Sequence, residues 1–390
     1  MTAMEHIRYL AETIGPRGST TPKEEQAARY AAQVLGQAGL EPVTEPFTSA
    51  RSNYHPLVLS TSFFLLGEIL FWIWGRTGAI VAFALCLLVL VATLLKLAMR
   101  PNPLRWLIPK GRSQNVWAKI PASGNTRTQV VMTGHLDSHR TPLIFSSDQW
   151  VKIFNTFIPL GLVSIVLDII LFGVGILSSG LLWRILSLPF ALVVLGLFLL
   201  MLQADFTPYT AGANDNASGA GIILSLAERL KREPLANTTV WTVLTGCEEV
   251  GDYGAEAFAQ AHKPELKDSI WMAVDGVGGK DTNPTYLAQE TFLLTSPSDP
   301  QLIKLAGEVA KAHPELQAEM RSFRGAFTEG AIGYKYGFRV LSFVNFRKDM
   351  MLPGWHRPTD VVGNIDPEVV ARSEGFLWEI LKEIDREAGS

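Results

Sequence analysis

The chain has 390 residues, of which 48% are hydrophobic and 18% are charged. This apolar content exceeds what one soluble core of this length needs, so a membrane-embedded part is expected. The formal net charge of -3 at pH 7 lacks the basic surplus that nucleic-acid binding requires, so nucleic acid is not an expected partner.

Two pairs of long apolar segments stand out along the chain. The first pair covers residues 56–74 and 78–99, and the second covers residues 154–177 and 181–202. Each segment holds about 20 residues, which at a rise of about 1.5 Å per residue matches a hydrocarbon core about 30 Å thick. Because only short turns join the members of each pair, at 75–77 and 178–180, we expect two transmembrane helical hairpins. Helices buried in a globular core are the alternative, since they can also be apolar on all sides.

Outside these segments, strand-like runs alternate with helical ones. The strand-like runs cover residues 41–48, 115–120, 128–135, 238–246, 269–276 and 339–346, and the helical runs cover residues 22–40, 217–232, 253–262, 300–313 and 328–336. This alternation predicts an α/β fold with a doubly wound, mostly parallel sheet that carries helices on both faces.

The hairpins look like insertions into this α/β domain. We expect the domain to consist of residues 1–50, 113–140 and 206–390. The first hairpin insertion then covers residues 51–112, and the second covers residues 141–205. The three domain segments together have a reasonable size for one domain.

Polar side chains gather where the predicted strands end, which is where such sheets bind ligands. These side chains are His135, Asp137, Asp215, Glu248, Glu249 and Asp275. Imidazole nitrogens and carboxylate oxygens are zinc ligands, and three protein ligands leave one position of the ion open for catalysis.

The number of candidate ligands fits two zinc ions. Two ions about 3.5–4 Å apart need a bridging carboxylate, because their mutual repulsion is otherwise unscreened. His135, Asp215, Glu249, Asp275 and His356 give each ion three ligands if Asp215 is shared. Glu248 then remains next to a ligand as the candidate general base.

The motifs GHLDS, GANDNASGAG, GCEEVGDYGAEAF and VDGVG, followed by a late HRPTD, resemble in order and wording the dinuclear zinc peptidases of metallopeptidase family 28. The resemblance is to the aminopeptidase Y and bacterial leucyl aminopeptidase type, and residues 15–40 are similar to the opening helices of that family. It implies a zinc exopeptidase fold with two Zn2+ ions as cofactors. His135 and Asp275 would bind one ion, Glu249 and His356 the other, and Asp215 both.

The resemblance also implies that Asp137 is a carboxylate that orients His135 and assists catalysis beside Glu248. One departure from the family pattern is the position of the second hairpin, between His135 and Asp215, where the family usually has a short loop. We expect this insertion to hold the catalytic mouth near the lipid bilayer. The expected substrate is therefore a peptide that is hydrophobic or derived from the membrane.

Together these features predict a membrane-bound dinuclear zinc exopeptidase, and most simply an aminopeptidase. It would hydrolyse peptide bonds with a zinc-activated water and Glu248 as general base. The enzyme alternatives are a related zinc amidohydrolase or deacylase and a glutaminyl cyclase. A receptor-like module with an inactive site is the alternative that is not an enzyme.

The distribution of basic residues predicts how the hairpins are oriented. The distal turns offer only Arg76 and nearby Arg184. The flanks on the side of the α/β domain carry Arg51, Lys96, Arg100, Arg105, Lys110, Arg112, Arg140 and Lys152. Positive charge favours the cytoplasmic side, so we expect an integral membrane protein whose catalytic domain is cytoplasmic.

Three further residues have no assigned role at this point. Glu68 and Asp168 lie inside the apolar segments, where an ionisable side chain is costly. We expect them to pair between helices or to extend toward the membrane surface, and the alternative is that they line a substrate path. His139 follows the GHLDS motif where the second insertion begins, and its role is left open.

Overall fold

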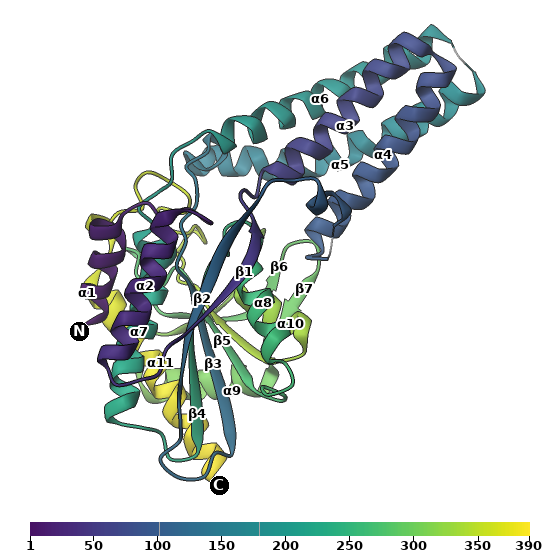
Figure 1. Cartoon of the computed structure of the whole chain (residues 1–390). Coiled ribbons are helices and arrows are strands. Elements are labelled where there is room, and N and C mark those ends of the chain that lie inside the picture. Colours follow the sequence, from purple (N-terminus) through teal and green to yellow (C-terminus); the bar gives the residue numbers. More distant parts are fainter. Residues whose placement is uncertain (101, 179) are drawn as a thin grey trace. The chain divides into compact units, whose positions relative to one another are not determined.

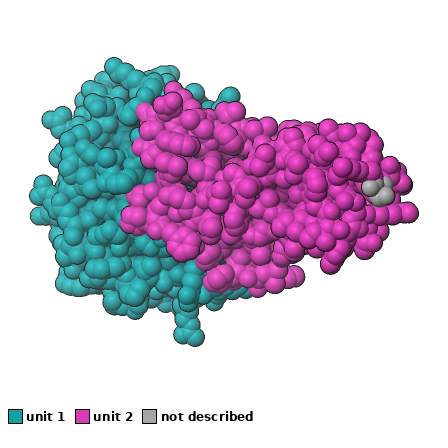
Figure 2. Space-filling view, turned by 90° about the horizontal axis from the view of Figure 1, so that it is seen from above, with its two compact units in different colours: residues 1–51, 110–140, 209–390 teal, residues 52–109, 141–208 magenta. Residues whose placement is uncertain are grey.

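The computed structural model describes residues 1–100, 102–178 and 180–390, which form two compact units (Figures 1 and 2). Unit 1 consists of residues 1–51, 110–140 and 209–390, and unit 2 consists of residues 52–109 and 141–208. Unit 2 is thus made from two segments that interrupt unit 1 in the sequence. The expected turn at 178–180 includes Ser179, which lies outside the described residues.

Unit 1 is built on a mixed sheet with nine strands within the described residues. The strands are β1 (Val43–Ala50), β2 (Lys110–Ile120), β3 (Thr128–His135), β4 (Thr238–Thr245), β5 (Ile270–Val274), β6 (Thr285–Thr291), β7 (Thr295–Pro297), β8 (Glu319–Arg324) and β9 (Arg339–Phe343). Their order is β1-β2-β4-β3-β5-β9-β6-β7, and β8 pairs with β6.

The centre of this sheet is parallel. Strand β3 runs parallel to β4 and β5, and β9 runs parallel to β5. Antiparallel pairs flank this centre, with β1 and β2 on one side and β6 and β7 on the other. Because β3, β4 and β5 are parallel neighbours, their carboxyl ends meet at one edge of the sheet.

Helices cover both faces of the sheet (Figure 1). They are α1 (Ala3–Arg8), α2 (Pro22–Gln37), α7 (Gly219–Arg232), α8 (Tyr253–His262), α9 (Pro300–Ala312), α10 (Glu329–Tyr336) and α11 (Pro367–Gly389). Helices α1, α2, α7, α9 and α11 share one apolar core with the sheet. Helices α8 and α10 pack together against aromatic side chains of the other face, including Trp241 and Trp271.

Three of these helices begin with the same local chemistry. Thr21, Asp299 and Asp366 each accept a hydrogen bond from a backbone N–H in the first turn of α2, α9 and α11, respectively. A proline follows each of these residues, and proline suits the first helical position because that position needs no N–H donor. The sequence therefore sets where each of these helices starts.

The predicted fold class is confirmed, with a mostly parallel sheet centre and helices on both faces. Alternation in the sequence does not predict β6, β7, β8 or α11. The short strand β7 is largely exposed and β8 is only partly buried, so neither shows a sustained apolar run. The N-terminal helix α1 continues as a wider helical turn to Ile14.

The described residues of unit 2 contain four long helices. They are α3 (His55–Trp74), α4 (Arg76–Leu97), α5 (Asp148–Leu177) and α6 (Leu181–Asp205). Each is long and apolar enough to cross a membrane, yet only 22–33% of the most apolar window of each helix is buried. Large apolar side chains instead point outward, including Leu66, Ile69, Ile73, Ile80, Leu87, Val91, Val163, Ile170, Ile185, Leu192 and Leu199. Exposed apolar surface on this scale disfavours the alternative of helices buried in a globular core.

The interior of unit 2 contains close helix contacts and polar groups. Phe71 of α3 and Phe172 of α5 pack edge to face with ring centroids 5.2 Å apart. Glu68 accepts hydrogen bonds from Trp72 Nε1 at 3.0 Å and from Ser187 Oγ at 2.5 Å, so it pairs α3 with α6. Asp168 is fully buried. Pairing between helices is therefore observed for Glu68.

Gly78 lets α4 approach the backbone of α3, since a Cβ atom at Gly78 would lie 1.9 Å from the Leu70 carbonyl oxygen. We expect Gly78→Val to destabilise unit 2 by about 1–3 kcal/mol, because the added carbons overpack this contact. The measurement is the midpoint of thermal unfolding in detergent. Gly196→Val in α6 is the matched control, because a Cβ atom there meets nothing within 4 Å. Equal midpoints for the two variants would contradict the close contact.

Candidate metal centre

The structure brings the predicted site residues together at the carboxyl edge of the central strands. His135 is the last residue of β3, Glu248 and Glu249 follow β4, and Asp275 follows β5. Asp215 lies in the irregular turn Ala213–Ser218 before α7, Asp137 lies two residues beyond β3, and His356 lies on the loop between β9 and α11. Segments that are distant in the sequence thus supply one site.

His135 faces three carboxylates with its Nε2 atom. This nitrogen lies 3.2 Å from Asp215 Oδ1, 3.6 Å from Asp275 Oδ1 and 3.7 Å from Glu248 Oε2. His135, Asp215 and Asp275 each offer one ligand atom, and these atoms lie within 4.8 Å of one another. The three residues therefore fit the coordination of a single ion.

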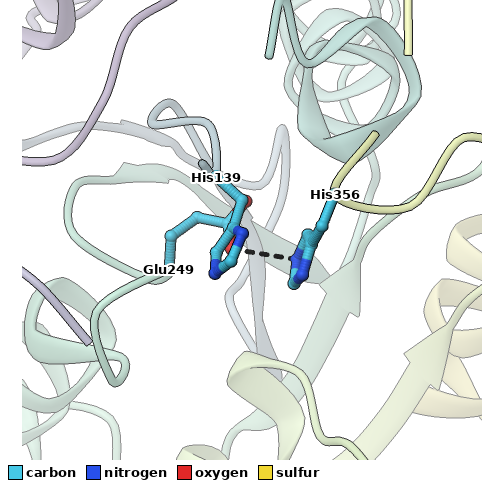
Figure 3. Close-up of side chains that lie close together, drawn as sticks. All are labelled: His139, Glu249 and His356. Carbon is cyan, nitrogen blue, oxygen red and sulfur yellow. Dashed lines mark ion pairs between the residues drawn. The ribbon is translucent and has the colours of Figure 1, made fainter. Parts of the chain in front are cut away.

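His356 forms a second group with Glu249, seen in Figure 3. Its Nε2 lies 3.2 Å from Glu249 Oε2 and 3.3 Å from Asp215 Oδ2. Asp215 therefore faces His135 with one oxygen and His356 with the other. This arrangement allows one carboxylate to serve two ions.

Buried ligand atoms support a metal site at these groups. Among the described residues, His135 Nε2 and Glu249 Oε1 are buried atoms with no hydrogen-bond partner. Burying a polar atom without a partner costs about 1–3 kcal/mol, so an imidazole nitrogen aimed at carboxylates suits a cation between them. Imidazole and carboxylate are the donors that zinc accepts, and the residues present therefore fit this metal.

The pKa values reflect how many charges converge on the site. Burial, reinforced by the charge of Asp215, raises the pKa of Glu249 to about 8. Burial alone would lower the pKa of His356, yet the charges of Glu249 and Asp215 raise it to about 9. Burial would raise the pKa of Asp215, but the facing His135 and His356 lower it below its usual range. A bound cation would favour the charged form of each of these carboxylates.

Glu248 lies at the site with 11% of its side chain exposed. Burial and the charge of Asp252 raise the pKa of Glu248 well above its ordinary value. The Glu248 carboxylate forms an ion pair with His135, whereas the carboxylate of the adjacent Glu249 forms one with His356. The two glutamates thus have different histidine partners in their ion pairs, although single ligand atoms of His135, Glu248 and Glu249 also lie within 4.8 Å of one another.

Asp137 holds the turn that carries the two glutamates. Its carboxylate accepts the backbone N–H of Glu248 at 3.1 Å and of Glu249 at 3.2 Å. The Asp137 carbonyl oxygen accepts from His135 Nδ1 at 3.1 Å, and this bond leaves Nε2 of the neutral ring as the acceptor. Asp137 thus contacts both His135 and the glutamate turn.

Sequence reasoning missed two buried residues that support the site. Arg17 is fully buried and donates to the carbonyl oxygens of Ala211 and Gly212, with a distance of 2.7 Å for Gly212. Glu24 of α2 accepts the backbone N–H of Cys247 at 2.9 Å. A charged residue in an N-terminal turn or a first helical turn usually faces solvent, so no local signal marked either one.

His139 also belongs to the site, although the motif left its role open. Its ring stacks on that of His356 with a centroid separation of 3.6 Å (Figure 3). Burial and the neighbouring His356 lower the pKa of His139 well below its ordinary value. In the sequence, the only indication that His139 belongs to the site was its position directly after the GHLDS motif.

Comparison with known proteins gives one family match. The model of peptidase family M28 matches residues 198–381. Comparison with curated protein sequences gives no match.

Several solved structures have a similar fold. The glutaminyl cyclase of Tannerella forsythia is 13% identical, with a TM-score of 0.58 and coverage of 98% of this chain and 97% of that chain. BSAP, a zinc aminopeptidase from Bacillus subtilis, is 14% identical, with a TM-score of 0.58 and coverage of 98% and 94%. A leucine aminopeptidase precursor from Bacteroides thetaiotaomicron is 12% identical, with a TM-score of 0.57 and coverage of 98% and 96%.

At these identities the solved structures show a shared fold alone. The family match adds sequence evidence over the segment that contains Asp215, Glu248, Glu249, Asp275 and His356. The family resemblance drawn from the motifs is thereby confirmed, and residues 198–381 match peptidase family M28.

Proposed function

We propose that the chain is a membrane-embedded zinc exopeptidase, specifically an aminopeptidase that holds two zinc ions. The observation that carries the proposal is the position of Asp215. Its Oδ1 lies 3.2 Å from His135 Nε2, and its Oδ2 lies 3.3 Å from His356 Nε2. A carboxylate placed between two donor groups suits a two-metal site, in which the ions are about 3.5–4 Å apart. The match to a peptidase family supports hydrolysis of a peptide bond.

Each ion would have three protein ligands. His135 and Asp275 would hold one ion, Glu249 and His356 would hold the other, and Asp215 would contact both. Two zinc ions, when bound, supply polarisation of the scissile carbonyl and a lowered pKa for a nearby water molecule. Proton transfer and orientation remain the work of the side chains.

Glu248 is the proposed general base. Its Oε2 lies 3.7 Å from His135 Nε2, and its backbone is held by the hydrogen bond to Asp137. Its carboxylate takes a proton from the attacking water as the oxygen bonds to the carbonyl carbon. Glu248 then gives this proton to the leaving amine when the carbon–nitrogen bond breaks.

The four apolar helices support a membrane location. Their outward side chains are apolar, and burial in lipid would remove this surface from water at a gain of about 25 cal/mol per Å². The excess of Lys and Arg on the flanks that join unit 1 favours a cytoplasmic peptidase unit. Helices α5 and α6 lie in the sequence between His135 and Asp215. We infer that the substrates are hydrophobic or membrane-derived peptides.

Glutaminyl cyclase activity is the second candidate. The specific observation that favours it is the presence of glutaminyl cyclases among the similar solved structures. The position of Asp215, with one oxygen 3.2 Å from His135 Nε2 and the other 3.3 Å from His356 Nε2, favours the dinuclear peptidase over a one-zinc site. The reaction on an N-terminal glutamine separates the two activities.

Glu248→Gln tests the assignment of the base. The amide cannot accept a proton, so we expect the turnover number to fall by about 10²–10⁴-fold. Zinc per chain, measured by elemental analysis, should stay at the wild-type value because Glu248 is not a proposed ligand. Glu233→Gln is the control, since Glu233 is exposed at the end of α7. Near-normal turnover in Glu248→Gln would show that another group is the base.

Peptides with N-terminal glutamine test the reaction class. An aminopeptidase should release free glutamine and a peptide shortened by one residue. A cyclase would instead release ammonia and leave the number of residues unchanged. We expect shortened products by mass spectrometry in detergent or nanodiscs, and no cleavage of N-acetylated peptides. Ammonia release without shortening would favour the cyclase over the peptidase.

A further inference from the structure

His139 and His356 are two buried histidines that come together from distant parts of the chain. His139 lies just beyond β3, and His356 lies on the loop before α11. Their ring centroids are 3.6 Å apart and the angle between the ring planes is 14° (Figure 3). The ring of Trp355 also lies 4.6 Å from that of His356. The His356 imidazole therefore has ring neighbours that restrict its rotation.

Hydrogen bonds hold both the ring and the backbone of His139. Its Nδ1 donates to the carbonyl oxygen of Arg140 at 2.7 Å, because a carbonyl oxygen can only accept. The carbonyl oxygen of His139 accepts the backbone N–H of Thr210 at 2.8 Å. With 4% of its surface exposed, the ring is a rigid support.

Distance alone would allow His139 to bind a metal ion. His139, Glu249 and His356 each offer one ligand atom, and these atoms lie within 4.8 Å of one another. The lone pair of an imidazole nitrogen lies in the plane of its ring, however. Because the two planes are nearly parallel and 3.6 Å separates the centroids, an ion in the plane of His356 lies well outside the plane of His139. The stacked arrangement therefore argues against ligation by both rings.

We propose that His139 is a positioning residue that holds the His356 imidazole by stacking, with His356 Nε2 directed at Glu249 and Asp215. This inference rests on the proposed role of His356 as a metal ligand. A ligand whose ring is already oriented loses less conformational freedom when the ion binds. His139 thereby strengthens binding of the ion next to Glu249 without contacting it.

Two substitutions test the proposal, because one removes only the nitrogen atoms of the ring and the other removes the whole ring. His139→Phe keeps an aromatic ring against His356, whereas His139→Ala removes it. We expect His139→Ala to lower the affinity for one of the two zinc ions about 10–100-fold, which is the effect typical of residues that orient a metal ligand. His139→Phe should keep the wild-type affinity for both ions. The measurement is a zinc titration of the purified full-length chain against a chromophoric chelator.

The visible absorption of the cobalt-loaded chain gives a second readout. The spectrum of His139→Phe should match that of the wild type, because no ligand has changed. His313→Ala is the control for loss of a histidine, since His313 lies on the loop after α9, remote in sequence from every proposed ligand.

Each outcome decides the question. Equal weakening in His139→Phe and His139→Ala would make the nitrogen a ligand and overturn the positioning role. Wild-type affinity in His139→Ala would show that stacking contributes nothing. Failure of the proposed function would appear differently, as a wild-type chain that binds no zinc.

Discussion

Asp215 is a carboxylate with 6% of its surface exposed, and its two oxygens face two different imidazoles. Burying such a group is costly unless charged or hydrogen-bonding partners surround it. Asp360 accepts the backbone N–H groups of Asn214 at 2.6 Å and Asp215 at 3.1 Å, and Arg17 binds the carbonyl oxygen of Gly212. The turn is thus held by charged groups on both sides, and the rest of the site is arranged around the carboxylate that it presents.

The two units differ in where their apolar side chains lie. In unit 1, strands β4 and β5 are buried along their whole length, and amphipathic helices cover the sheet, as expected for a domain folded in water. In unit 2, the interior is mostly apolar apart from buried polar groups such as Glu68 and Asp168, and many outward side chains are apolar as well, which suits lipid as the surrounding medium. The peptidase part therefore supplies its own core, and the helical segments are additions whose apolar surface needs a separate explanation.

Sequence patterns predicted strands β1 to β5 and β9, the four apolar helices and the residues that meet at the site, because strand ends and motifs can be recognised in short stretches of sequence. The same patterns could not reveal Arg17 and Glu24, since their roles depend on contacts with residues that lie far away in the sequence. His139 was visible but had no assigned role, because stacking on His356 depends on how two loops approach each other. Strand β8 was not predicted because its sequence has no clear alternation of apolar and polar residues. The features that could not be predicted thus depend on contacts between residues that are far apart in the sequence.

Anomalous diffraction at the zinc absorption edge, from crystals of the zinc-loaded full-length chain, would show how many zinc ions the site holds and which residues bind them. A dinuclear site should give two peaks about 3.5–4 Å apart, one on each side of Asp215. One peak should contact His135 and Asp275, and the other should contact Glu249 and His356. A single peak, or peaks that do not touch Asp215, would contradict a dinuclear site built on this carboxylate.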